Sequence, residues 1–362
     1  MKKITNHLKL LGYFFRLGFF TFGGPFAIIA QIQRDLVDRR KLISQDNFKK
    51  SLALIKSFPG PTGTQVMMFS AHQVGGFWFS LAASVLFILP SYLMMVILAA
   101  YYDQYHANQE ILIFLEGMQA GAFVLIMMAL YNLTKPNLSS IRFWTIFYVA
   151  LILIGLLKFS EPLVIIGAGL AAMFWSFRPE KKTLLKSYVP WDLFLISIKA
   201  GTLAFGTGYA IIPLLQHDYV EIHNWITKAQ FMDALAFGQL TPGPVSISVT
   251  FVGYRVAGWA GATAATVGIF LPGFINMTTW FPRAFEWFEK QSWVKPFVMG
   301  ATASIAAGII VTFLSMSVST SILRLIIPSL LVWLSVSRNL PSWAVVILSG
   351  SGWWIFSHLL NP

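Results

Sequence analysis

Long apolar runs follow one another along almost the whole chain, and most are close to the length that crosses a lipid bilayer. A helix needs about 20 apolar residues to span the hydrocarbon layer. Ten such runs lie at about 8–31, 77–102, 111–132, 143–157, 163–177, 191–214, 257–280, 296–316, 322–337 and 341–358, and two more, broken by prolines, at about 48–72 and 231–254. Only 11% of the residues are charged, against about 25% in soluble domains. The sequence predicts an all-α polytopic membrane protein without a soluble domain.

The net charge of +12 has a simple explanation in such a protein. Lys and Arg gather in the loops that stay on the cytoplasmic side of a membrane, so the excess does not indicate a nucleic-acid partner. The chain has no cysteine, which excludes disulfides and thiolate chemistry. The N-terminal segment resembles a signal peptide, but Arg16 interrupts it and no small-residue cleavage site follows. We expect a retained first helix.

The chain repeats itself with an offset of 183 residues. Pro-Gly-Pro at 59–61 (the first proline break) recurs at 242–244 (the second proline break). The same offset pairs "FGGPFAII" (22–29) with "FGTGYAII" (205–212), Gly18 with Gly201, Asp35 with Asp218 and, after a one-residue slip, Pro90 with Pro272. We expect two repeats, an N-terminal unit with its linker over 1–186 and a C-terminal unit over 187–362. Repeats of this kind usually hold a substrate site at their interface.

Matching loops of the two repeats differ in charge. Residues 34–50 carry six basic side chains, whereas residues 217–233 carry only Lys228. Since basic loops stay inside, the repeats should be inverted, which requires an odd number of crossings in each. We assign the proline-broken run as re-entrant, which gives five crossings per repeat, ten in all, with both termini outside. The lysines near the N-terminus disagree with that side: Lys2, Lys3 and Lys9.

The breaks themselves indicate an anion site. Irregular backbone at membrane depth is tolerated only where protein buries it or it lines a wet cavity, and a helix that restarts there presents free N–H groups and a positive dipole end. A single Pro or Gly in such a helix is more often a kink, but four breaks in symmetric pairs favour a site. The candidate substrate-binding residues are Gly23, Gly24, Gly60, Thr62, Thr64, Gln65, Gly206, Thr207, Gly208, Gly243, Ser246 and Ser248.

Cations flank these breaks and complete the candidate site. Arg16 and Lys199 occupy matching places before the two glycine-rich breaks, Gly23-Gly24-Pro25 and Gly206-Thr207-Gly208. Lys56 precedes the first proline break, with Gln239 as its counterpart. A cation at the centre of a membrane helix costs about 2.5–3.5 kcal/mol on insertion scales. The alternative is that these side chains extend to the membrane interface. Glu116, the one acid inside a predicted crossing, lies near the outer end of its helix, which argues against a coupling role.

No pattern of catalytic chemistry appears. We find no His/Glu metal spacing, no Ser–His–Asp candidate and no phosphate-binding glycine loop. The sequence therefore predicts no enzyme, no metal and no cofactor, and pumping driven by ATP on this chain alone is excluded.

The two halves together resemble a known family. The segments "RLGFFTFGGPFAIIAQIQRDLVDRRKLIS", "FPGPTGTQV", "GTGYAIIPLLQHDYVEIHNWIT" and "ALAFGQLTPGPVSISVTFVGYRVAG" are similar to the chromate ion transporter (CHR) family, over about residues 9–315. The resemblance implies a two-repeat exporter of the inner membrane that lowers cellular chromate and confers resistance. Some members are linked to sulfate instead. Thr207 departs from the glycine usual in the family, which adds a hydroxyl or marks a different substrate.

Three readings stay open from the sequence. The first is a secondary transporter of chromate, the second a transporter of sulfate or another oxyanion, and the third an anion channel or scaffold without a transport cycle. The expected partners are a chromate- or sulfate-like oxyanion and the lipid bilayer of the cell (inner or plasma) membrane, crossed several times. A homodimer is left open, and no nucleic acid is expected.

Inversion of the repeats can be tested by labelling, because the chain has no native cysteine. Cysteines introduced singly at Gln45 and at its counterpart Lys228, which lie in the two matching loops, should react with a membrane-impermeant maleimide from opposite faces. Labelling of both from the same face would exclude the inverted arrangement.

Overall fold

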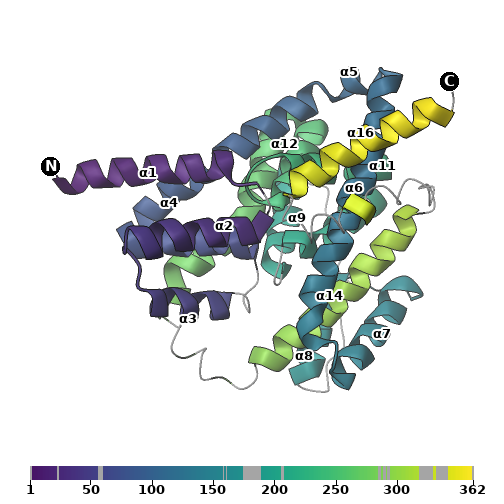
Figure 1. The fold of residues 1–362 in the computed structure, drawn as a ribbon. Coiled ribbons are helices and arrows are strands. Elements are labelled where there is room, and N and C mark those ends of the chain that lie inside the picture. The colour runs from purple at the N-terminus through teal and green to yellow at the C-terminus, as the bar shows by residue number, and fades with distance from the viewer. Residues whose placement is uncertain are drawn as a thin grey trace.

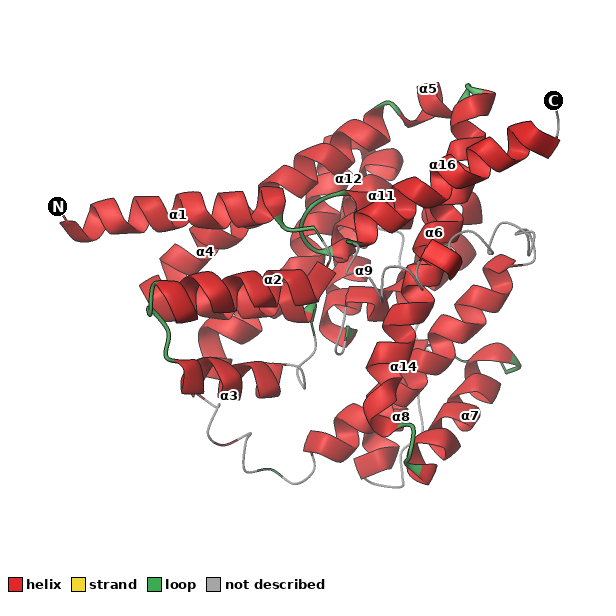
Figure 2. Cartoon of the chain, viewed as in Figure 1, coloured by secondary structure: helices red, strands yellow, loops and turns green. Residues whose placement is uncertain are grey.

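The chain is described by a computed structural model over residues 2–22, 24–55, 60–157, 159, 161–173, 189–204, 208–283, 287, 291, 294–317, 329–331 and 341–360. Every regular element in these ranges is a helix (Figures 1 and 2). The predicted all-α class is therefore confirmed.

Helices of the first half lie mostly at the left and lower right of Figure 1. They are α1 (Lys2–Phe20), α2 (Gly24–Ile32), η1 (Gln33–Arg39), α3 (Gln45–Ile55), α4 (Thr62–Ala100), α5 (Tyr102–His106), α6 (Gln109–Thr134), η2 (Lys135–Asn137), α7 (Ile141–Gly155) and α8 (Glu161–Met173). The second half supplies α9 (Val189–Leu203), η3 (Gly208–Ile211), α10 (Ile212–Gln216), η4 (His217–Ile222), α11 (Lys228–Leu240), η5 (Val245–Ile247), α12 (Ser248–Ile275), η6 (Asn276–Trp280), α14 (Val294–Ser317) and α16 (Ser342–Leu360).

The longest helices, α4 and α12, are hairpins rather than straight rods. The Ser80 hydroxyl donates to the Met68 carbonyl at 2.7 Å, although twelve residues of straight helix would hold them about 18 Å apart. The chain folds back at Gly76, which has a φ of 76°. In α12 the turn lies at Gly258 (φ 57°), and Thr250 and Thr266 meet across it at 2.6 Å.

A second reversal occurs at the first proline break. Phe48 and Ile55 of α3 line the same small cleft as Val66 and Gln73 of α4. A helix running straight through the break would separate Phe48 from Gln73 by roughly 37 Å. The chain therefore reverses direction between α3 and the start of α4.

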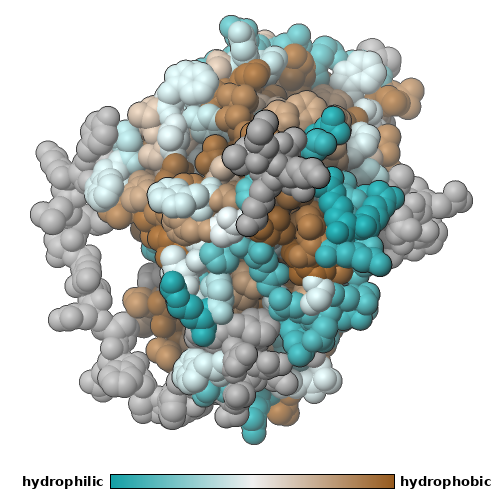
Figure 3. Space-filling view, turned by 90° about the vertical axis from the view of Figure 1, so that its left-hand side faces the viewer, coloured by the Kyte–Doolittle hydropathy of each residue, from teal (hydrophilic) through white to brown (hydrophobic). Residues whose placement is uncertain are grey.

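Apolar helices and apolar surface characterise an integral membrane protein. In the described ranges, three helical stretches are long and apolar enough to cross a membrane: Thr62–Ala100, Gln109–Asn132 and Val245–Arg283. Two shorter apolar helices are Ile141–Gly155 and Pro296–Val311. Large apolar side chains such as Trp78, Ile141 and Leu156 are more than three-quarters exposed, and Figure 3 shows brown apolar atoms reaching the surface beside a teal polar area.

The same local structure recurs at positions paired by the offset of 183. A Cβ atom at Gly18 would overlap the carbonyl of Phe87, and one at Gly201 the carbonyl of Ile269. The π-helices η1 and η4 are followed by Lys41 (φ 50°) and Asn224 (φ 49°), the two described non-glycine residues with positive φ. These pairs reflect one packing scheme used twice.

Helices are also exchanged between the halves. The last helix, α16, lies along α6 of the first half, where the small residues Gly117 and Gly121 approach Ser349 and Gly350. In return, α14 packs against α7 and α8 of the first half (Figure 1). Small residues let membrane helices approach closely enough for extensive van der Waals contact. Each half therefore completes the packing of the other.

The tight α12 hairpin generates a stability prediction. A Cβ at Gly253 would lie 2.4 Å from the Gly261 carbonyl oxygen, so Gly253→Ala should separate the two arms and destabilise the protein by about 1–3 kcal/mol. Thermal unfolding in detergent measures this. Gly167→Ala is the matched control, because nothing lies within 4 Å of that Cβ and alanine favours a helix by about 0.5–1 kcal/mol over glycine. Equal melting temperatures for the two variants would contradict the packing.

Candidate functional site

The two proline breaks meet the opposite halves of the chain through backbone hydrogen bonds. The Gly243 N–H donates to the Thr21 carbonyl at 2.8 Å, and the Gly60 N–H donates to the Ala204 carbonyl. Gly60 and Gly243 are counterparts, as are Thr21 and Ala204, which precede the two glycine-rich breaks. Each proline break is thereby bonded to the other half, at the residue two positions before that half's glycine-rich break.

Glycine is required at both bonded positions. Gly60 has a φ of 128° and Gly243 a φ of 97°, a region that side chains with a Cβ rarely enter. A Cβ at Gly60 would also lie within 2.7 Å of the Gln65 side chain, and one at Gly243 would lie 3.0 Å from the Ser91 hydroxyl. The neighbouring prolines fix φ and donate no hydrogen bond, so the sequence Pro-Gly-Pro sets the shape of each break.

Both helices that restart after these breaks begin without a side-chain cap. Pro61 occupies the N-cap of α4, and the first helical bond runs from Gln65 N–H to the Pro61 carbonyl at 3.0 Å. Pro244 occupies the same place before η5 and α12. The first N–H groups of a helix have no partner within it, and they form the positive end of the helix dipole.

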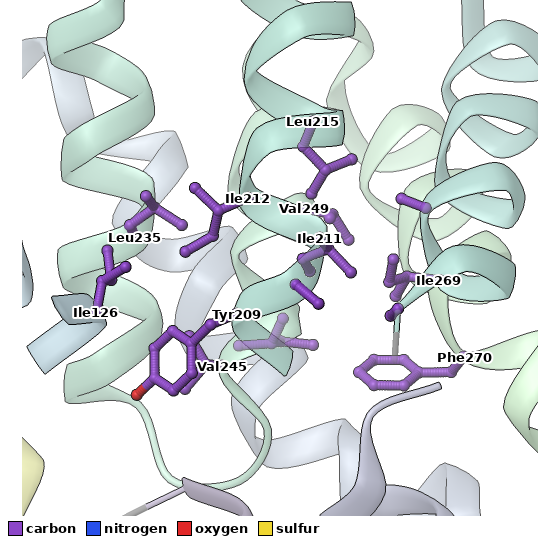
Figure 4. Packing of buried hydrophobic residues seen from close by; sticks show 14 of the residues in the cluster. Ile126, Tyr209, Ile211, Ile212, Leu215, Leu235, Val245, Val249, Ile269 and Phe270 are labelled. Atoms are coloured by element: carbon purple, nitrogen blue, oxygen red, sulfur yellow. The ribbon is translucent and has the colours of Figure 1, made fainter. Parts of the chain in front are cut away.

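A small pocket lies between the two restarted helices. Its lining comes from both halves and comprises Pro25, Ile28, Pro61, Gly63, Thr64, Tyr209, Pro244, Val245 and Ser246. Figure 4 shows Tyr209 beside Val245, with its hydroxyl pointing away from Ile212 and Leu235 of the apolar core. The volume of the pocket is about 10 Å³, near the least that holds one water molecule. The described pocket is therefore too small to hold an oxyanion without widening.

Buried hydroxyls at the pocket lack hydrogen-bond partners. Thr64 is 1% exposed and Ser246 fully buried, and neither hydroxyl has a partner in the described part of the chain. The same holds for Thr21, whose carbonyl accepts the bond from Gly243. Leaving a polar group buried and unsatisfied costs about 1–3 kcal/mol. Two free hydroxyls beside two helix N-termini form a donor-rich, neutral site suited to an anion.

Tyr209 and Gln239 are joined on one side of the pocket. The Gln239 amide nitrogen donates to the Tyr209 hydroxyl at 2.8 Å, and the amide oxygen lies 3.2 Å from that hydroxyl. Gln239 is 5% exposed and stands where the first half has Lys56. The pair holds the Tyr209 ring against the pocket.

The predicted site residues are distributed unevenly about this pocket. Thr64 and Ser246 line it, Gly24 and Gly208 adjoin its lining residues Pro25 and Tyr209, and Thr62, Gln65 and Ser248 are buried on the adjoining helical turns. Four of the candidates lie outside the described residues: Gly23, Lys56, Gly206 and Thr207.

The two described cations do not line the pocket. Arg16 lies on the exposed face of α1. Lys199 forms an ion pair with the buried Asp218 carboxylate, so a neighbouring carboxylate already balances its charge. No charged side chain is among the described lining residues.

Sequence reasoning missed Tyr209, Pro25 and Ile28. Tyr209 carried a usable signal, since it follows the second glycine-rich break where the first half has Phe26. A ring hydroxyl that is present in just one of the two repeats indicates a specific role. Pro25 and Ile28 gave no such signal, because apolar residues are expected throughout a membrane helix.

Known proteins match both halves of the chain. A family model described as chromate transporter matches residues 8–173 and residues 191–354. The chain is 30% identical over 329 residues to a probable chromate transport protein of Synechococcus elongatus, covering 84% of each chain. It is 30% identical over 322 residues to a chromate transport protein of Cupriavidus metallidurans (83% of this chain, 80% of the relative), and 29% identical over 316 residues to an uncharacterized transporter of Methanocaldococcus jannaschii (78% of each). No solved structure matches the chain.

The unpartnered hydroxyls predict an unusual mutational response. Ser246→Ala removes a buried group that makes no hydrogen bond, so thermal stability should stay the same or rise by up to about 1–3 kcal/mol. Thr250→Val, on the directly following helix α12, is the matched control, and it should lower stability by about 1 kcal/mol because the Thr250–Thr266 bond is lost. Melting temperatures in detergent decide this. A Ser246→Ala variant less stable than Thr250→Val would show that the serine hydroxyl has a partner.

Proposed function

Because this chain belongs to the chromate transporter family, we propose that it is a secondary transporter that exports chromate, or a similar tetrahedral oxyanion, across the inner membrane and thereby confers chromate resistance. The single observation that carries the proposal is the pocket between the proline breaks, where the Thr64 and Ser246 hydroxyls are buried without partners. An oxyanion supplies the hydrogen-bond acceptors that these groups lack.

The chemistry of the pocket suits a tetrahedral dianion. Such an ion accepts hydrogen bonds at four oxygens, and the lining offers hydroxyl donors on opposite sides, from α4 and from η5. Helix N-termini attract negative charge without a full counter-charge. A neutral site binds and then releases a dianion more readily than a site with fixed lysines, since strong ion pairs would hold the substrate at low dielectric.

Substrate binding requires the pocket to widen. A volume of about 10 Å³ admits no more than about one water molecule, so an oxyanion enters only when the halves move apart at the breaks. The reciprocal bonds of Gly60 and Gly243 lie on the surfaces that must part. We propose that their breaking and re-forming on alternate sides gives alternating access.

We propose further that the halves, 1–186 and 187–362, are inverted repeats. The two separate matches of the family model support the repeat, and so do the recurring contacts of Gly18 and Gly201. Inverted repeats place the substrate near the membrane midplane at their interface, where the pocket would then lie.

The membrane potential favours the export direction. An inside-negative potential contributes about 2.3 kcal/mol per charge for each 100 mV, so a dianion gains about 4.6 kcal/mol on leaving. Uptake of the same ion requires a coupled cation or proton.

Sulfate is the second candidate substrate, because it shares the charge, the shape and the acceptor oxygens of chromate. Flux in proteoliposomes with the two ions in competition separates them. An anion channel remains the alternative class, and flux that does not saturate with concentration would identify it. The small volume of the pocket, which must widen to admit the ion, favours a carrier with a saturable site.

Removing the free hydroxyls should impair transport selectively. Hydrogen bonds to charged groups contribute about 1.5–3 kcal/mol, so Ser246→Ala or Thr64→Val should each weaken oxyanion uptake into proteoliposomes about tenfold to a hundredfold. Ser84→Ala is the matched control, because this buried hydroxyl donates to the Ser80 carbonyl at 2.7 Å away from the pocket lining. Normal chromate and sulfate flux in both pocket variants would exclude the pocket as the substrate site.

A further inference from the structure

A second polar cluster lies away from the pocket, around a carboxylate that is not exposed to solvent. Asp233 of α11 is fully buried. Its Oδ2 accepts a hydrogen bond from the Tyr102 hydroxyl at 2.5 Å, and its Oδ1 accepts one from the Gln119 amide at 2.8 Å. His106 Nε2 lies 3.2 Å from Oδ2. Three elements, α5, α6 and α11, therefore converge on one carboxylate.

His106 connects this carboxylate to water. Its side chain is 34% exposed, whereas that of Asp233 is 0% exposed. Tyr102 and Gln119 donate hydrogen bonds but hold no proton that titrates near neutral pH. Histidine exchanges protons in that range, so the imidazole is the one described neighbour through which a proton can reach Asp233.

The remaining charges nearby are already paired. Asp103 of α5 forms an ion pair with Arg255 of α12 at 2.7 Å, and that guanidinium lies over the Tyr102 ring at 4.9 Å. Glu110 of α6 lies 3.1 Å from His358 of α16. Glu116, one turn before Gln119 on α6, is the other acid on that helix. Among the described residues, His106 is therefore the one basic side chain within ion-pair distance of Asp233.

The cluster is mechanically linked to the pocket. Asp233 and Gln239 lie on the same helix, about 9 Å apart at 1.5 Å per residue, and Gln239 bonds to the pocket residue Tyr209. The second proline break follows directly after this helix. When Asp233 is ionised, Tyr102 and Gln119 hold α11 against α5 and α6. A protonated carboxyl accepts these bonds more weakly, so its protonation loosens the helix that carries Gln239.

The first half has no equivalent of this carboxylate. The counterpart of Asp233 is Lys50, whose side chain is 52% exposed and pairs with Asp46 on α3. A buried carboxylate that only held helices together would be expected in both copies of a shared packing scheme. Its presence in only one of the two repeats indicates a role in a step that occurs once in each transport cycle.

We propose that Asp233 and His106 form a proton-binding site, and that one proton bound there accompanies each oxyanion cycle. The inference rests on the proposed transport function and adds the coupling ion. A hydronium ion from bulk water gives its proton to Nδ1 of the neutral His106 ring, whose Nε2 already carries a hydrogen, and becomes water. The Nε2 proton then passes to Asp233 Oδ2, and the ring is left neutral with its hydrogen on Nδ1. One proton thus moves from water to the carboxylate with no other change in charge, and the reverse steps release it.

The test combines an ion flux with a proton flux. Proteoliposomes that contain a trapped pH-sensitive dye are given labelled chromate or, in parallel, labelled sulfate. We expect wild-type protein to move protons together with the oxyanion, and Asp233→Asn to lower the proton signal at least tenfold and to remove the pH dependence of the remaining oxyanion flux. Asp46→Asn is the matched control, because it removes an exposed carboxylate (79% exposed) at the corresponding end of α3, and it should behave as wild type.

A second variant covers the case in which Asp233→Asn fails to fold. His106→Gln changes a partly exposed side chain and should slow proton uptake at least tenfold while chromate and sulfate binding, measured by thermal shift, persists. Oxyanion flux without proton movement in the wild type overturns the inference and leaves the proposed function intact. Proton movement at the wild-type ratio in Asp233→Asn also overturns it. Absence of any oxyanion flux in the wild type overturns the proposed function and the inference together.

Discussion

Two backbone hydrogen bonds organise the centre of this protein. Each proline break gives its glycine N–H to a carbonyl of the opposite half, from Gly243 to Thr21 and from Gly60 to Ala204. Backbone groups away from water must find partners, and here the partner of each break is the other copy. The breaks can therefore exist only as a pair. Their prolines prevent the local helix from supplying the missing bonds, and the restarted helices begin without a side-chain cap.

No charged side chain is among the described lining residues of the pocket, which bears on how the proposed site would select an oxyanion. Fixed cations would bind any dianion strongly and release it slowly, because charge interactions in a dry interior are large. Hydroxyls such as those of Thr64 and Ser246, with helix N-termini beside them, would bind most strongly a ligand whose shape and acceptor oxygens match their positions. The Lys199–Asp218 ion pair keeps one basic side chain near the membrane part of the chain without adding net charge there.

The sequence predicted those features that depend on composition and on local chain geometry. Apolar runs gave the helical class, and the two Pro-Gly-Pro segments gave the reversal after Ile55 and several residues of the pocket. Hydrogen bonds between Gly243 and Thr21 could not be predicted, because they join residues far apart in the chain that no periodicity relates. From the sequence, Arg16 and Lys199 were both predicted to be substrate-binding cations. Matching positions in a repeat do not show which of two side chains lies beside a carboxylate.

Asp233 was also beyond sequence reasoning. It lies in a segment assigned as a loop beside Lys228, where an acid is expected to be solvated. Its burial depends on Tyr102 and Gln119, which arrive from the other half of the chain. Glu116 stands inside an apolar run of the sequence. However, the burial of a side chain in the folded protein depends on packing rather than on the hydropathy of its neighbours in the sequence.

The exchange of helices between the halves has a consequence for biosynthesis. Translation delivers α6, α7 and α8 well before their partners α14 and α16 exist. The close approach of Gly117 and Gly121 to Ser349 and Gly350 can therefore form only after α16 has been made. The packing of the first half is completed late, by helices of the second.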